Sequence, residues 1–379
     1  MKRAGLAVAA LALIAAACSE KQPAASGVGT EAEAKFFWDE PGVDHPSLIP
    51  LDEIVSGGPP PDGIPPIDEP KFISPAEAIW LDRQEPVMVV EIGEDARAYP
   101  LQILLWHEIV NDTVGGRPVL VTYCPLCNSA IVFDRTVRGN VTTFGTSGRL
   151  YNSDLVMYDR ATKSLWPQIL GKAVVGPMIR TELEVIPSAT TAFSDFRAAH
   201  PDGKVLSRDT GFDRDYGTTP YERYDSTADP FLFRGEVDTK LPAIARVVGV
   251  RTADGPKSYS VEALRRLGAA AAVNDRVGAT ELVVFFKRGT RSTLDGSLVA
   301  KSKDVGSSGV FSRRLGSRVF TFEADGDRFT DSETGSEWNI FGRAVAGPLL
   351  GRQLDMIDKV DTFWFAWAVF VPDAPLWTG

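Results

Sequence analysis

The sequence predicts a mainly β fold with a few short helices, a β-rich α+β chain arranged as two similar lobes from an internal tandem duplication. Three observations lead to this prediction. Short runs of β-branched and aromatic residues alternate with turn residues, and two long segments of the chain resemble each other. In addition, 379 residues with 44% hydrophobic content suffice for two domains or more.

The first 18 residues have the layout of a lipoprotein signal peptide. Lys2 and Arg3 form a basic start, and residues 4–17 form an apolar run that is too short to span a bilayer. The small residues directly before Cys18 resemble a lipobox, so we expect lipidation of Cys18. The residue after Cys18 is Ser19 and not Asp, and a serine at this position favours sorting to the outer membrane. We therefore expect a cell-envelope lipoprotein that faces the periplasm and contacts the membrane through its lipid anchor.

Residues 19–70 hold 10 of the 26 prolines, among small and acidic residues with little apolar periodicity. This composition is typical of an extended linker, so we predict a Pro-rich tether between the lipid and the folded body. Across the whole chain, 50 acidic residues outnumber 40 basic residues, and no long Lys/Arg cluster is interleaved with aromatics. We therefore expect no nucleic-acid partner.

The body of the chain contains two similar segments, which predict two copies of one unit. The matched pairs are 87–99 with 247–259, Asn111-Asp112 with Asn274-Asp275, 159–166 with 331–338, and 171–177 with 342–348. We predict a first lobe at 71–206, a crossing loop at 207–240 and a second, degenerate lobe at 241–379. In this alignment Trp166 matches Trp338, and each tryptophan is expected in the core of its own lobe.

Within each unit, apolar runs of strand length are separated by turn residues. The expected strands are 87–92, 119–123 and 131–133 in the first unit and 281–286 in the second. One short helix per unit is expected, at 101–109 and at 261–267.

Three residues whose side chains could bind a metal or react occur in the first unit only. His107, Cys124 and Cys127 are lost from the second, where Lys287 and Thr290 match the two cysteines. Because thiolates and imidazoles are soft or borderline donors, this set predicts a metal site, with copper favoured over zinc. The expected function is metal handling or electron transfer. A fourth ligand could come from residues specific to the first unit: Glu108, Asp154 or Met157.

Two alternatives compete with metal binding. A Cys-x-x-Cys pair in an exported protein could exchange thiols and disulfides or form a buried disulfide, and His107 could favour the Cys124 or Cys127 thiolate. A non-catalytic binding or scaffold lipoprotein with an envelope protein partner is the other alternative. Its support is the aromatic run 363–367, which more simply predicts core packing at the lobe interface.

Several motifs together resemble one family of bacterial and archaeal envelope proteins, catalogued as domain of unknown function family 3179. The motifs are Arg97-Ala-Tyr-Pro100, His107-Glu-Ile-Val-Asn-Asp112, Thr122-Tyr-Cys-Pro-Leu-Cys-Asn-Ser129 and Ser164-Leu-Trp166. The resemblance covers about residues 71–375 and implies no cofactor or catalytic residue, so the expected function depends on the residues themselves.

Overall fold

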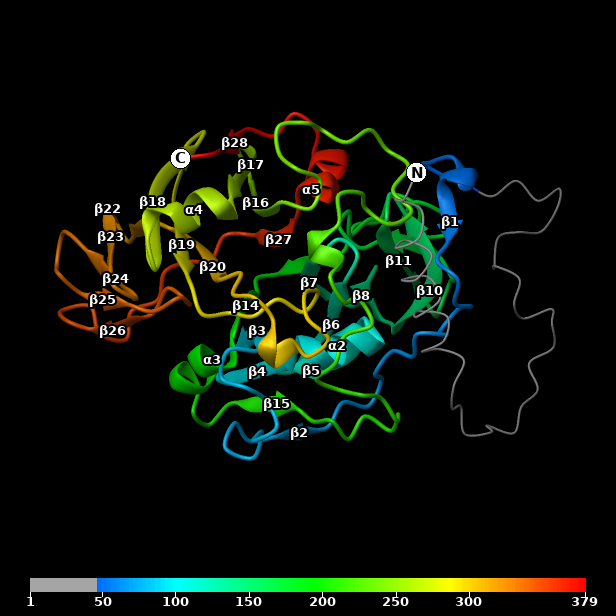
Figure 1. Cartoon of the computed structure of the whole chain (residues 1–379), viewed down its shortest axis with the longest axis horizontal. Helices are drawn as coiled ribbons and strands as arrows, with labels where there is room; N and C mark the ends of the chain where they lie inside the picture. The colour runs from blue at the N-terminus through cyan, green and yellow to red at the C-terminus, as the bar shows by residue number, and fades with distance from the viewer. Residues whose placement is uncertain (1–45) are drawn as a thin grey trace.

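The computed structural model describes residues 46–379 and shows a mainly β protein of several small sheets with short helices (Figure 1). This confirms the predicted fold class. The predicted signal peptide, Cys18 and the first part of the predicted tether lie outside the described residues.

The first half is built on a five-stranded sheet, a four-stranded sheet and two short helices. Apolar residues of 86–90 are buried in its central hairpin, as the run predicts. In spatial order the larger sheet contains β14 (Ala189–Ala192), β3 (Pro86–Ile92), β4 (Asp95–Pro100), β15 (Lys204–Leu206) and β2 (Phe72–Ile73). The second contains β13 (Val185–Ile186), β7 (Ser129–Asp134), β6 (Arg117–Cys124) and β5 (Ile109–Val114). The helices are α2 (Leu101–His107) and α3 (Phe193–Ala199).

A further four-stranded sheet of the first half carries the long hairpin that reaches the candidate site. It contains β1 (Ile54–Ser56), β10 (Phe144–Tyr151), β11 (Asp154–Asp159) and β12 (Leu165–Pro167). A small hairpin precedes it, formed by β8 (Thr136–Val137) and β9 (Asn140–Val141).

The second half repeats this order of elements. Its sheets are β27 (Lys359–Phe363), β16 (Arg246–Thr252), β17 (Gly255–Ser260) and β28 (Leu376–Trp377); β18 (Ala270–Val277), β19 (Thr280–Lys287) and β20 (Ser307–Ser312); and β23 (Phe322–Asp325), β24 (Arg328–Asp331), β25 (Glu337–Trp338) and β26 (Ala344–Ala346). The remaining elements are the hairpin β21 (Arg314–Leu315) and β22 (Arg318–Val319), with α4 (Val261–Leu267) and α5 (Trp364–Phe370). In both halves the last strand is parallel to its neighbour, β15 to β4 and β28 to β17.

Residues that the sequence pairs make the same hydrogen bonds in the two halves. Trp166 donates its indole N–H to Asp159 at 3.1 Å, and Trp338 donates to Asp331 at 2.9 Å. Equivalent bonds join Asn111 to Phe144 and Asn274 to Phe322, and Tyr99 to Asp112 and Tyr259 to Asp275. Each tryptophan is buried. The tandem origin and the superposition of the halves stay predictions.

The aromatic run 363–367 is core, as predicted. Phe363, Trp364, Phe365 and Trp367 are all buried and pack in one cluster with residues of the first half, including Cys124 and Cys127. The run therefore joins the two halves rather than offering an exposed surface.

Two connecting segments pack on the body. Residues 46–70, part of the predicted tether, contribute β1 to the sheet of β10, and Ile67 exchanges backbone hydrogen bonds with Ile109 and Asn111. The crossing loop, which contains the 3-10 turn η3 (Tyr224–Ser226), contacts both halves. Two other 3-10 turns are η2 (Leu51–Glu53) and η4 (Val299–Lys301). Among residues 46–379, the helices are all too short or too polar to cross a membrane.

Candidate metal centre

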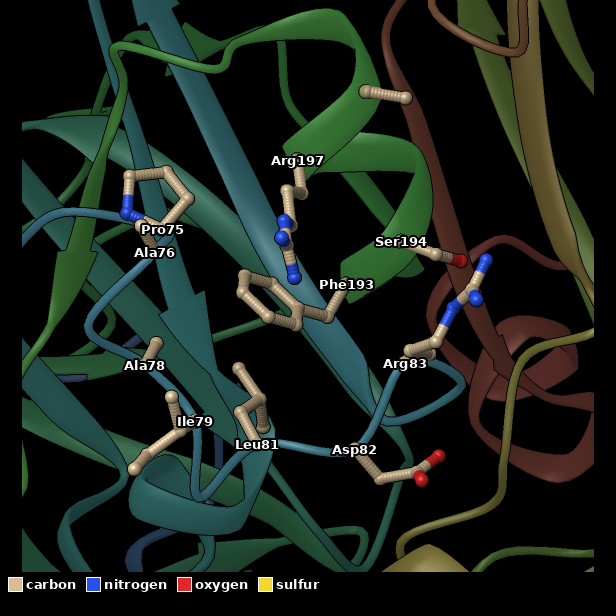
Figure 2. A pocket seen from close by; sticks show the side chains of 11 residues that line it. Pro75, Ala76, Ala78, Ile79, Leu81, Asp82, Arg83, Phe193, Ser194 and Arg197 are labelled. Atoms are coloured by element: carbon tan, nitrogen blue, oxygen red, sulfur yellow. The ribbon is translucent and has the colours of Figure 1, made fainter.

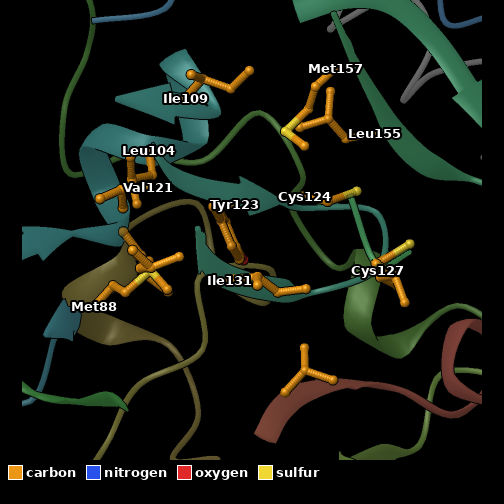
Figure 3. Close-up of a cluster of buried hydrophobic side chains, with 14 of the residues drawn as sticks. Met88, Leu104, Ile109, Val121, Tyr123, Cys124, Cys127, Ile131, Leu155 and Met157 are labelled. Atoms are coloured by element: carbon orange, nitrogen blue, oxygen red, sulfur yellow. The ribbon is translucent and has the colours of Figure 1, made fainter. Parts of the chain in front are cut away.

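Three buried donor side chains meet where two hairpins of the first half converge. The sulfur atoms of Cys124 and Cys127 and a carboxylate oxygen of Asp154 all lie within 4.8 Å of one another. All three side chains are buried, and both cysteines are free thiols. Figure 3 shows the two cysteines at the tip of their hairpin, beside Leu155 and Met157.

The β6–β7 hairpin presents the cysteines. Cys124 ends β6 and pairs in register with Ser129, the first residue of β7, so that residues 125–128 form the loop. Asn128 closes the loop with φ 51°, a left-handed conformation that asparagine tolerates. The loop thus brings two thiols to one side without a helix at the motif, as the sequence indicated.

The β10–β11 hairpin presents Asp154. Tyr151 pairs with Asp154, and the two residues between them, Asn152 and Ser153, have φ of 49° and 68°. Positive φ at both central positions is the geometry of a tight two-residue hairpin turn. The carbonyl of Ser153 accepts from the Cys127 thiol at 3.5 Å and from the Cys124 thiol at 3.8 Å, so this turn lies directly on the cysteine pair.

The Asp154 carboxyl is only half satisfied by the protein. Its Oδ2 accepts the backbone N–H of Ile169 at 2.9 Å. Its Oδ1 is buried and has no hydrogen-bond partner among the described residues. A buried acceptor without a partner is costly, so this oxygen is available to a bound cation.

Burial favours the protonated forms of Asp154 and Cys127 in the absence of a cation. It raises the pKa of Asp154 to about 8 and raises the pKa of the Cys127 thiol well above its ordinary value, where Cys124 and Asp154 add to the effect. Three negative charges in one buried group need a compensating positive charge. A metal ion would supply it and release the protons.

Parts of the chain far from the two hairpins enclose the group. The crossing loop covers it, because the Ser153 hydroxyl donates to the carbonyl of Phe231 at 2.5 Å and the Phe231 N–H donates to the hydroxyl of buried Tyr224 at 3.3 Å. From the second half, Arg251 donates to the carbonyl of Ile169 at 3.0 Å. Ile169 thus links the two side chains, since its N–H donates to Asp154 and its carbonyl accepts from Arg251.

The structure does not bring His107 into this donor group. Nδ1 of His107 lies 2.7 Å from the carbonyl oxygen of Pro65, and Nε2 lies 2.6 Å from the hydroxyl of Tyr216. Because a carbonyl only accepts, Nδ1 carries the proton and Nε2 accepts from Tyr216. Burial lowers the pKa of His107 to about 4, so the ring is neutral. Both nitrogens are in use, which corrects the expectation that His107 is a ligand.

The other two ligand candidates are near the group without being part of it. Leu155 and Met157 point from one face of β11 into the core cluster that holds both cysteines (Figure 3). Coordination by Met157 stays a prediction. Glu108 is buried at the end of α2, and burial, followed by the nearby Asp154, raises its pKa to about 8.

Asp154, which sequence reasoning offered only as a fourth ligand, is the third donor. One signal could have ranked it higher: fifteen positions separate Phe144 from Asp159, whereas nine separate the matching Phe322 from Asp331. The hairpin is longer in the first half, and Asp154 lies in the extra length.

The second half fills the matching positions with ordinary interactions. Lys287 ends β19, as Cys124 ends β6, and forms an ion pair with Asp195 at 2.7 Å. Thr290 hydrogen-bonds with Ser307. The donor group therefore belongs to the first half.

A separate cavity of about 680 Å³ lies between residues 75–83 and α3. Figure 2 shows Ile79, Leu81 and Phe193 along it, with Arg83 and Arg197 nearby. It is lined by neither cysteine nor histidine, so it is distinct from the donor group.

Comparison with known proteins places most of the chain in one family. Residues 61–374 match the family described as Protein of unknown function (DUF3179), and the chain belongs to it. No curated protein and no solved structure matches the chain.

Proposed function

We propose that this DUF3179 protein binds a metal ion through Cys124, Cys127 and Asp154. The observation that carries the proposal is the buried, unpartnered Oδ1 of Asp154 in a group whose donor atoms lie within 4.8 Å of one another. Thiolate and carboxylate ligands at such spacing can bind one ion.

The donor chemistry favours zinc, with copper(I) as the alternative. Zinc accepts thiolate sulfur and carboxylate oxygen together, whereas copper(I) prefers soft ligands throughout. Replacement of the expected imidazole by a carboxylate therefore shifts the preference from copper towards zinc. One observation still favours copper(I): the thioether of Met157, a soft ligand, belongs to the same buried cluster as the two cysteines.

Thiol–disulfide exchange has less support. Reactive cysteines are partly exposed and have a lowered pKa. Here Cys124 is 2% exposed and Cys127 is fully buried, and burial raises the pKa of Cys127. Both features disfavour the nucleophilic thiolate in the absence of a metal.

We also propose that the protein is an envelope lipoprotein, anchored through Cys18, that faces the periplasm and works with an envelope protein partner. The support is the signal-peptide pattern of residues 1–18. Cell fractionation of a Cys18→Ala variant tests the anchor: the variant should leave the membrane fraction. A Cys18→Ala protein that still sediments with membranes would contradict the assignment.

Zinc titration of the reduced chain against a chromophoric chelator tests metal binding. We expect one ion per chain and a large loss of affinity in Cys124→Ser, Cys127→Ser and Asp154→Asn. His107→Gln is the matched control, because it alters a buried polar side chain outside the group. A chain that binds neither zinc nor copper(I), or one in which His107→Gln is as damaging as Asp154→Asn, would overturn the proposal.

A further inference from the structure

Two adjoining cavities of about 50 and 30 Å³ lie between the halves, next to the Cys-x-x-Cys loop. Their shared walls include Asn128, Arg246, Gly306 and Asp361. Tyr123 and Asn128 flank the two cysteines in sequence but line the larger cavity. The segment 123–128 therefore contributes residues both to the candidate metal centre and to this cavity.

Positive charge exceeds negative charge around the larger cavity. Asp361 is the carboxylate in its lining, and its two oxygens already accept from Ser308 and Lys359. Arg246 and Arg291 also line it. Arg246 is paired with Asp225, but Asp225 has a second cation in Lys303 at 2.7 Å.

Hydrogen-bond donors also exceed acceptors there. Nε of Arg291 is buried without a partner among the described residues. The hydroxyls of Thr290 and Ser307 share one hydrogen bond. The hydroxyls of Tyr123 and Thr293 are also bonded, at 2.6 Å, but Tyr123 donates its own hydrogen to Oδ1 of Asn128 at 3.4 Å, so only the Thr290–Ser307 pair has a spare hydrogen. Two hydroxyls carry two hydrogens, so a pair joined by one bond retains a hydrogen for a further acceptor.

The size limits the ligand. One water molecule needs roughly 10–15 Å³ of cavity volume, so a cavity of about 50 Å³ holds a few waters or a single small ion. A peptide, a sugar or a nucleotide exceeds this volume.

We propose that this cavity binds a small oxyanion, a phosphate-sized ion or a short carboxylate, between Arg246, the amide of Asn128 and the hydroxyl of Thr290. The oxygens of such an ion accept from the surplus donors, and its charge balances the arginines. The proposal is independent of the proposed metal site, because Cys124, Cys127 and Asp154 do not line the cavity.

Calorimetric titration of the metal-free full chain with inorganic phosphate, sulfate and acetate, in separate arms, tests the proposal. At least one of these ions should bind saturably to the wild-type chain. Asn128→Asp keeps a side chain that tolerates the left-handed backbone and adds a negative charge, so it should weaken binding at least about tenfold at pH 8. Asn152→Asp is the matched control, since Asn152 also has positive φ and lies outside the cavity, and it should bind as the wild type does.

A second variant tests the same cavity in case Asn128→Asp does not fold. Thr290→Val removes one hydroxyl of the pair that has a spare hydrogen, without changing the shape, and should weaken binding several-fold. Near-ultraviolet circular dichroism checks the fold of each variant. No saturable binding by the wild type up to about 10 mM of any of the three ions would overturn the proposal. Equal affinity in wild type and in whichever of these two cavity variants folds would do the same.

Discussion

Thr362 of the second half donates its hydroxyl to the backbone carbonyl of Cys127 at 2.8 Å. The same oxygen accepts the N–H of Phe363 at 2.9 Å. The loop that carries the two thiols is therefore fixed by β27, a strand more than two hundred residues away in sequence. The second half lacks the donor residues, yet it positions those of the first.

Loss of this contact should weaken metal binding without removing a ligand. In Thr362→Val the shape is kept and the hydroxyl is lost, so we expect zinc affinity to fall about tenfold, as for other groups that orient ligands. Chelator competition measures it. The control is Thr113→Val, at an exposed position of β5. Unchanged affinity in Thr362→Val would show that β27 does not position the site.

The buried thiols should react slowly in the folded chain. Both lie beneath the Ser153 turn and the crossing loop, and burial raises the pKa of Cys127, so little thiolate is accessible. A chromogenic disulfide reagent should modify native metal-free protein much more slowly than protein in denaturant. Immediate reaction of both Cys124 and Cys127 in native protein would instead support the exchange function.

The two matched tryptophans should contribute equally to stability. Trp166 and Trp338 are buried and each bonds an aspartate seven positions earlier. Replacement of either by alanine should lower the free energy of unfolding by about 3–5 kcal/mol, measured by urea denaturation. A cost below about 1 kcal/mol at either position would contradict the core role of that residue.

The contribution of Glu85 to stability should fall as pH rises between about 4.5 and about 7. Burial raises the pKa of Glu85 from 4.5 to about 7, although the Asp82 N–H and Gln102 oppose this. The folded state therefore holds the Glu85 proton more tightly than the unfolded chain does. The contribution, about 3 kcal/mol in all, is present below pH 4.5 and is lost as pH rises through 7.

Glu85→Gln should remove this part of the pH dependence in urea denaturation curves. Glu77→Gln is the control, because hydrogen bonds from Ser74 lower the pKa of Glu77, and its titration falls below the same window. An identical slope in Glu85→Gln and wild type would show that Glu85 is not the group responsible.

The sequence predicted features that depend on local pattern. Alternating apolar runs predicted β3, β6, β7 and β19, and the loss of both cysteines from the second half identified the thiol pair. The aromatic run 363–367 was predicted as core because it contains almost nothing polar.

Features that depend on distant contacts could not be predicted in the same way. His107 lies in the helix expected for it, but its two partners, Pro65 and Tyr216, come from segments 42 and 109 residues away. Asp154 reaches the thiols only because a tight turn at Asn152 and Ser153 directs a long hairpin towards them. Composition alone also assigned residues 46–70 to a tether, although β1 pairs with β10.

X-ray absorption spectroscopy of the zinc-loaded chain tests the central claim most directly. A site made by Cys124, Cys127 and Asp154 predicts two sulfur atoms at about 2.3 Å and oxygen ligands at about 2.0–2.2 Å, with no imidazole scattering. The spectrum should be the same in His107→Gln and should lose an oxygen ligand or the bound zinc in Asp154→Asn. An imidazole contribution that disappears in His107→Gln, or zinc bound without sulfur, would contradict the account.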